Sequence, residues 1–176
     1  MYNINIFFVY SIIGFIYESI FNLINEGTFK SGFLYGPYTP IYGIGVLIIL
    51  CINNKLKKYS KTKRYILLPI ISSLILTTLE FICGNLLETL FHRYYWNYSN
   101  LYFSFGKYIA LEVSIVWGLA SYLVIFINSK IEKYIKKIPK PITIILSIIF
   151  IFGAPPAPHP KNEALLSKLY CLNISL

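Results

Sequence analysis

The chain alternates long apolar runs with short polar segments. Five apolar stretches follow one another, at residues 4–24, 38–52, 65–90, 108–127 and 141–153. A helix needs about 20 residues to cross the hydrocarbon core of a bilayer, and the first, third and fourth stretches are that long. The pattern predicts an all-α fold, a polytopic transmembrane helix bundle of about five spans.

The second and fifth stretches are short for regular spans. The second begins in GPYTPIYGIG, whose glycines and prolines (Gly36, Pro37, Pro40, Gly43 and Gly45) disturb regular helix. We expect re-entrant or broken structure there, continuing as helix. The fifth stretch runs into a proline-rich tail, residues 154–176, which cannot continue a helix. We interpret residues 1–153 as the membrane domain and the tail as a truncated or disordered end.

Charge sets the orientation of the bundle. Of the sixteen Lys and Arg residues, eleven lie within two short segments between apolar runs, residues 55–64 and 130–140. Positive charge is retained on the cytoplasmic side of membrane proteins, so both segments are predicted cytoplasmic loops and the N-terminus is predicted to be cytoplasmic. The same placement next to anionic lipid argues against nucleic acid as a partner despite the net charge of +9. We expect a multi-pass protein of the bacterial plasma membrane.

No motif in the sequence marks a familiar enzyme or cofactor site. The sequence has no phosphate-binding GxxxxGK[ST], no HExxH, no GxSxG and no CxxC. The three cysteines are widely separated and have no histidine cluster beside them. We therefore assign no catalytic residue, no metal and no cofactor to the chain.

Small and polar residues recur along one side of the first, third and fourth predicted helices. In the first helix Ser11, Gly14 and Glu18 follow at steps of three or four, and in the third Glu80, Gly84 and Glu88 do so at steps of four. Helices in lipid associate through such faces, so these stripes are the predicted interior of the bundle.

The four glutamates in or at the ends of spans are the candidate functional groups. They are Glu18, Glu80, Glu88 and Glu112. A carboxylate at the centre of a membrane helix costs about 2.5–3.5 kcal/mol, so we expect the four to cluster around a shared polar interior. One interpretation is an outward-facing cavity that binds a cation, a cationic substrate or protons. The other is that the carboxylates are protonated, or paired with Arg93, Lys107 or tyrosine hydroxyls, and only hold the helices together.

Three residues of the second predicted outer loop are further cavity candidates. His92 lies four residues after Glu88, within reach of it on a helix, and is interpreted as a proton relay, a ligand or a solvated side chain. Trp96 and Tyr98 are interpreted as interfacial belt residues that also line the site.

The first two predicted hairpins share an order of features. Each has a carboxylate in the outer half of its rising helix, then an aromatic outer loop, then a descending helix with glycine or serine. Parallel repeats of this kind occur in transporters, although membrane constraints alone can produce the same order. Both explanations stay open from the sequence.

Four motifs taken together resemble a known family. They are IIGFIYESI, GFLYGPYTPIYGIG, LEFICGNLLETLFHRYYWNYSN and LEVSIVWG, in that order within residues 4–128. This order resembles the ABC-transporter type IV permeases, the CmpB-type bacterial membrane proteins. The positions that match the family motifs are Glu18, Gly36, Pro37, Pro40, Tyr42, Gly43, Glu80, Gly84, Glu88, Trp96, Tyr98, Ser99, Glu112, Trp117 and Gly118.

The resemblance implies a transport function without naming a substrate. It adds Tyr42 to the cavity candidates and implies structural roles for the motif residues Gly36, Pro37, Pro40, Gly43, Gly84 and Gly118. A permease of this type needs a separate ABC ATPase, which would dock on the cytoplasmic loops 53–64 and 128–140. Five spans are few for a pore, so we expect a homo- or hetero-oligomer.

Two other functions are compatible with the sequence. One is a membrane enzyme acting on a lipid-type substrate at the outer interface, with the carboxylates and His92 as acid and base. The other is a non-catalytic assembly or sensor subunit whose glutamates pair with partner helices.

Overall fold

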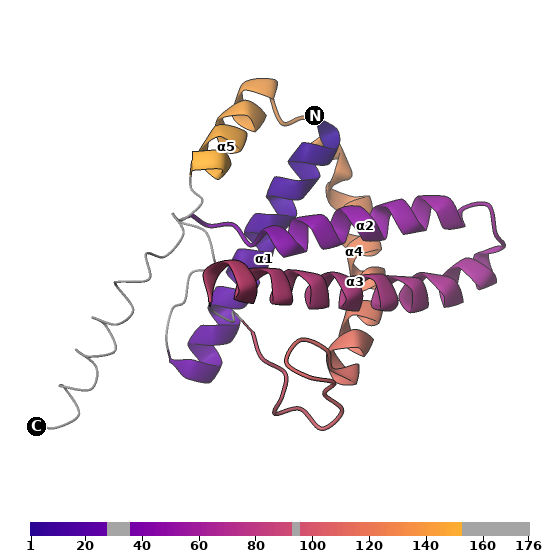
Figure 1. Ribbon diagram of the computed structural model, residues 1–176. Helices are drawn as coiled ribbons and strands as arrows, with labels where there is room; N and C mark the ends of the chain where they lie inside the picture. Colours follow the sequence, from indigo (N-terminus) through magenta and orange to yellow (C-terminus); the bar gives the residue numbers. More distant parts are fainter. Residues whose placement is uncertain (28–35, 93–95, 153–176) are drawn as a thin grey trace, which may run out of the picture.

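Five helices make up the part of the chain that the structure describes. The computed structural model describes residues 1–27, 36–92 and 96–152 (Figure 1). The helices are α1 (Tyr2–Glu26), α2 (Pro40–Leu56), α3 (Lys61–Phe91), α4 (Leu111–Ile135) and α5 (Lys140–Phe152). These residues form no strand beyond one isolated bridge between Ser104 and Ala110, so the predicted all-α fold is confirmed. The tail at residues 154–176 lies outside the described residues.

Three helices are long and apolar enough to cross a membrane. They are α1, α3 and α4, with spans at Tyr2–Ile24, Lys61–Leu90 and Leu111–Ile135. At 1.5 Å per residue, the 31 residues of α3 are about 46 Å long, which exceeds the roughly 30 Å hydrocarbon core. The 17 residues of α2 reach only about 25 Å, and α5 has 13 residues. The short second and fifth stretches therefore form short helices.

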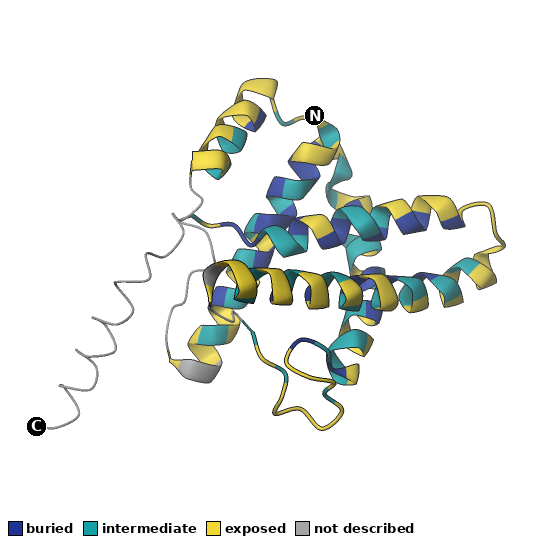
Figure 2. Cartoon of the chain, viewed as in Figure 1, coloured by how far each residue is buried: buried dark blue, intermediate teal, exposed yellow. Residues whose placement is uncertain are grey.

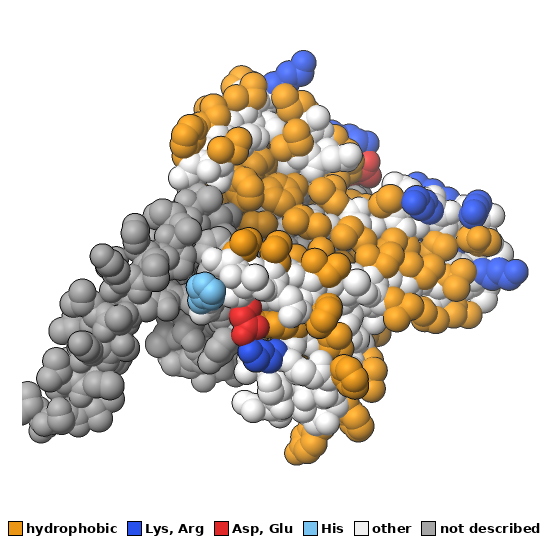
Figure 3. Space-filling view, in the orientation of Figure 1, with side chains coloured by type: hydrophobic (Ala, Val, Ile, Leu, Met, Phe, Trp, Pro, Cys, Tyr) orange, Lys and Arg blue, Asp and Glu red, His pale blue; other side chains and the backbone are white. Residues whose placement is uncertain are grey.

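The helices pack in chain order, α1 on α2, α2 on α3 and α3 on α4, while α5 lies against α1. Buried residues gather where α1 crosses α2, and the visible side of α3 is largely exposed (Figure 2). Apolar side chains cover much of the outer surface, and basic side chains lie at the end of the α2–α3 hairpin and over the start of α5 (Figure 3). Such an apolar exterior needs lipid around it.

Small residues allow the helices to approach closely. A Cβ atom at Gly43 of α2 would collide with the Ser11 hydroxyl and lie 2.5 Å from the Phe7 carbonyl oxygen, both in α1. A Cβ at Gly118 of α4 would lie 3.2 Å from the Pro69 carbonyl oxygen in α3. Gly118 belongs to a predicted stripe and Gly43 does not, and both lie at the close helix contacts that small residues form in lipid.

Residues 36–39 approach α1 near its middle before α2 begins. The backbone N–H of Thr39 donates to the Ser11 carbonyl at 3.0 Å, and Tyr38 and Thr39 are buried. Ser11 lies fifteen residues before the end of α1 at Glu26, about 22 Å along the helix. Non-helical backbone therefore lies deep in the bundle and against protein, the setting in which membrane proteins tolerate it.

The close contact at Gly43 generates a stability prediction. Gly43→Ala forces a methyl group into the Ser11 and Phe7 atoms of α1, and overpacking of this kind costs about 1–3 kcal/mol. Gly45→Ala is the matched control, because its Cβ would meet only Leu76 at 3.4 Å, an ordinary contact. We expect thermal unfolding in detergent to show a lower midpoint for Gly43→Ala and an equal or higher midpoint for Gly45→Ala. Equal midpoints for the two variants would contradict the close α1–α2 packing.

Candidate functional site

Two of the four glutamates come together around Tyr42. Glu18 extends from α1, and the Thr39 hydroxyl donates a hydrogen bond to its carboxylate at 3.2 Å. Glu80 extends from α3 and is only 6% exposed. The Tyr42 side chain of α2 interacts electrostatically with both carboxylates. Helices α1, α2 and α3 therefore meet at an acidic centre inside the bundle.

A residue of the α3–α4 loop and a residue of α4 complete this centre. The Tyr98 hydroxyl, from the loop between α3 and α4, donates to the Glu80 carboxylate at 2.9 Å. The Trp117 side chain of α4 lies at the same centre, with its ring centroid 5.9 Å from the Tyr42 ring centroid. We call this set the central acidic cluster. Its members are Glu18, Thr39, Tyr42, Glu80, Tyr98 and Trp117.

Tyr98 remains a hydrogen-bond donor over the physiological pH range. Burial, followed by the neighbouring Glu80 carboxylate, raises the pKa of Tyr98 above its ordinary value of 10.0. The folded state therefore binds the phenolic proton more tightly than the unfolded state does. The stability contributed by this proton is present below pH 10 and is lost only as the pH rises above that value.

The other two glutamates, Glu88 and Glu112, have partners outside the central acidic cluster. Glu88 pairs with Lys107 at 2.5 Å and accepts a hydrogen bond from the Tyr108 hydroxyl at 2.8 Å. Glu112 accepts a hydrogen bond from the Phe103 backbone N–H at 3.1 Å. Both therefore hold the α3–α4 loop in place, and the structure gathers two of the four predicted carboxylates in one cluster.

The two hairpins contain the same arrangement of glycine, tyrosine and glutamate. A Cβ at Gly14 would collide with the Tyr42 ring, and Tyr42 also faces Glu18, four residues after Gly14. A Cβ at Gly84 would likewise meet the Tyr108 ring, at 2.5 Å, and Tyr108 binds the carboxylate four residues after that glycine. In each case the absent side chain leaves room for a tyrosine that reaches the glutamate one turn away. The sequence showed the similar order of the hairpins but not this contact.

The remaining candidates lie outside the central acidic cluster. His92 is exposed and ends α3 in a left-handed conformation (φ 52°), with its backbone N–H donating to the Glu88 carbonyl. Trp96 packs edge-on against Tyr108, at 6.0 Å between ring centroids. Gly36 precedes the buried Tyr38, and Pro40 begins α2. Pro37 is exposed in the same non-helical segment.

Sequence reasoning did not single out Thr39, and it named Lys107 and the tyrosine hydroxyls only as general partners of the carboxylates, without assigning them to Glu88. Thr39 offered one signal, a hydroxyl between two prolines in a segment predicted to be broken.

The described residues contain no group of three His, Cys, Asp or Glu side chains placed to hold a metal ion. What the central acidic cluster offers chemically is two carboxylates and several hydroxyls, a set that can hold a proton or coordinate a hard cation.

A comparison with protein families matched most of the chain. The model of the family described as putative ABC-transporter type IV matches residues 5–154. Neither the search of curated proteins nor the search of solved structures found a match.

The hydrogen bond from Tyr98 to Glu80 generates a second prediction. Tyr98→Phe leaves a buried carboxylate without this donor, which costs about 1–3 kcal/mol. The same substitution at Tyr102, which is 99% exposed in the same loop, is expected to change the stability by less than about 0.5 kcal/mol. The measurement is the free energy of unfolding in detergent. If Tyr98→Phe proves as harmless as Tyr102→Phe, the loop does not bind Glu80.

Proposed function

This chain belongs to the family described as putative ABC-transporter type IV, and from that premise we propose that it is the membrane subunit of a transport complex. In this proposal the central acidic cluster binds the transported species, a proton or a small cation. The substrate class follows from the chemistry of the cluster, since the family description names none.

The observation that carries the proposal is the meeting of Glu18 and Glu80 from separate helices at Tyr42. Carboxylates are expensive in a membrane, and ion and proton pathways are where they are found. Helix packing alone does not need them, because the small-residue contacts at Gly43 and Gly118 already join the helices. Tyr98 also connects the cluster to the predicted outer loop, the side from which a solute would enter.

An ABC ATPase would dock on the predicted cytoplasmic ends of the bundle. The α2–α3 turn contains only four residues, 57–60, between the two helices. The Arg64 guanidinium donates two hydrogen bonds to the Asn53 side-chain oxygen, at 2.7 and 3.0 Å. These bonds join the two helices beside the turn, so the lysines of the turn form a basic surface on a well-fixed backbone. The α4–α5 loop offers a second basic surface.

The complex needs more than one membrane chain. The three long and two short helices of the described residues are few for a pore, so we propose a homo- or hetero-oligomer in the bacterial plasma membrane, with the N-terminus in the cytoplasm.

A third prediction tests both parts of the proposal. The tagged chain is expressed with an ABC ATPase encoded beside it, purified and reconstituted in proteoliposomes that contain pH- and potassium-sensitive dyes. We expect the ATPase to co-purify and ATP to drive flux. Glu80→Gln and Glu18→Gln are each expected to reduce the flux roughly tenfold or more, with co-purification unchanged.

Glu88→Gln is the matched control, because the structure places that glutamate in a salt bridge outside the cluster. It is expected to retain most of the flux. Flux that survives Glu80→Gln would overturn the role of the cluster. If Glu80→Gln instead lowers abundance or assembly, with no flux in the parent protein, the chain is an assembly subunit.

A further inference from the structure

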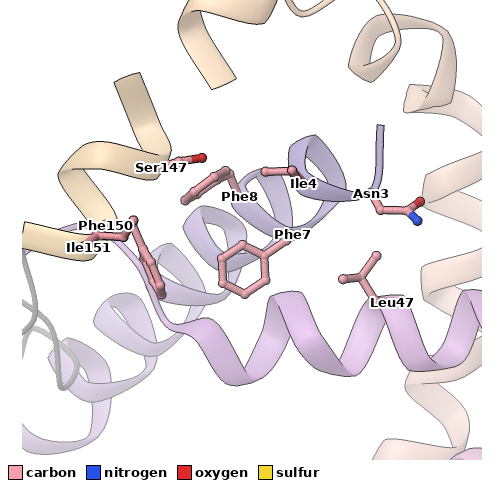
Figure 4. A pocket seen from close by; sticks show the side chains of 8 residues that line it. All are labelled: Asn3, Ile4, Phe7, Phe8, Leu47, Ser147, Phe150 and Ile151. Atoms are coloured by element: carbon pink, nitrogen blue, oxygen red, sulfur yellow. The ribbon is translucent and has the colours of Figure 1, made fainter. Parts of the chain in front are cut away.

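A cavity of about 330 Å³ opens between α5 and the first two helices, away from the central acidic cluster. In Figure 4 side chains from α1, α2 and α5 surround it. Most of its wall is apolar: Ile4, Phe7, Phe8, Leu47 and Phe150. Its volume is at the lower end of the range typical of small-molecule sites.

The cavity lies between two sets of contacts that hold α5 against the rest of the bundle, one at each end of the helix. The Thr143 hydroxyl donates to the Asn5 side-chain oxygen at 2.6 Å, and the Asn5 amide nitrogen donates to the Ile135 carbonyl at 3.4 Å. Thr143 and Asn5 are 1% and 4% exposed. This buried connection fixes the start of α5 against α1 and α4. Farther along, Phe150 packs edge-on against the Phe7 and Phe8 rings, and the gap toward Leu47 stays open.

Water does not suit this cavity. A buried water molecule needs two to four polar partners. Of the described residues that line the cavity, only Asn3 and Ser147 have polar side chains, and the Ser147 hydroxyl already donates to the Thr143 carbonyl at 2.8 Å. A complete helix, about 10–12 Å across, is too bulky for a volume of about 330 Å³, whereas a hydrocarbon chain is narrow and apolar enough to enter.

The depth of the cavity matches an acyl chain of the predicted cytoplasmic leaflet. Ser147 and Phe150 lie seven and ten residues after Lys140, about 10–15 Å along α5. Half of a hydrocarbon core is about 15 Å thick, so the cavity lies at acyl-chain depth when the start of α5 is at the membrane surface.

Basic residues lie where the lipid headgroup would be. Lys137 and Lys140 are exposed in and just after the α4–α5 loop. Lys136 lies over the Tyr2 ring at 5.4 Å, which places this loop beside the start of α1 and next to the cavity residues Asn3 and Ile4. Lysines at a membrane surface attract anionic lipid.

We propose that this cavity is a binding site for a phospholipid with an anionic headgroup, one acyl chain lying between α1, α2 and α5 and the headgroup at Lys137 and Lys140. The proposal rests on membrane insertion and on the geometry of the cavity, and it does not depend on the proposed transport function. A lipid bound here supports α5 on the side of the cavity, between the helix contacts that the described residues make.

The test uses fluorescence quenching by brominated lipids. Phe150→Trp places a reporter in the cavity, and Ile149→Trp places one on the neighbouring exposed position of α5, 47% exposed. Each variant is reconstituted in phosphatidylcholine that contains about 10 mol % of phosphatidylglycerol with brominated acyl chains. The signal of the unmodified protein, which reports Trp96 and Trp117, is subtracted.

We expect Phe150→Trp to be quenched several-fold more than its neighbour, whose quenching follows the bulk lipid composition. Lys137→Gln with Lys140→Gln is expected to reduce the excess roughly fivefold. Lys55→Gln with Lys57→Gln, at the other basic loop, is expected to leave it unchanged. If Phe150→Trp does not fold, Ile151→Trp, also in the cavity wall, replaces it.

Equal quenching of Phe150→Trp and Ile149→Trp would overturn the proposal, because the cavity would then hold only bulk lipid. Weaker quenching of Phe150→Trp would also overturn it, since a second copy or another protein would then fill the cavity. If the excess quenching of Phe150→Trp is unchanged when Lys137 and Lys140 are replaced by Gln, the two lysines do not bind an anionic headgroup.

Discussion

Glu80 must be supplied with polar partners from several elements, and the arrangement of the bundle follows from that requirement. Its carboxylate lies in α3, in a setting where lipid offers no hydrogen bond. Tyr98 binds it from the α3–α4 loop, Trp117 of α4 lies at the same centre, and Tyr42 connects it to Glu18 in α1. The α3–α4 loop therefore folds back over the helices, and the non-helical residues before α2 place Tyr42 next to both glutamates. The proposed transport site and the packing of four helices thus depend on the same contacts.

The similarity of the two hairpins has a physical basis, because each hairpin contains the same arrangement of a glycine, a tyrosine and a glutamate. In both, a glycine accommodates a tyrosine ring, and the tyrosine faces a glutamate one turn later. The two copies differ in their surroundings. Glu18 is enclosed among helices, whereas Glu88 also binds the exposed Lys107. One arrangement therefore contributes to the central acidic cluster, and the other fastens the loop that covers it. Parallel repeats whose copies take separate roles are known in transporters.

The sequence predicted the helices better than the partners of the glutamates. The apolar runs located all five helices. However, α4 continues to Ile135, past the predicted end at residue 127. Its last turns alternate lysines with apolar residues, a pattern typical of a helix that extends beyond the hydrocarbon core. Helix α3 begins at Lys61, before the predicted 65, because the Ser60 side chain caps it. Glu88 and Glu112 were expected in one cluster with Glu18 and Glu80. Their actual partners, Lys107 and the Phe103 backbone, depend on how the loop at 96–110 folds, which hydrophobic periodicity does not encode.

The most direct test of this account is whether Glu18 and Glu80 influence each other's contribution to stability. The free energy of unfolding in detergent is measured for Glu18→Gln, Glu80→Gln and the double variant. Groups that share Tyr42 as a partner should show a coupling energy of at least about 0.5 kcal/mol. Additive effects, within roughly 0.3 kcal/mol, are typical of residues that share no partner. That result would show that the two carboxylates do not meet, and it would remove the basis for a common binding site.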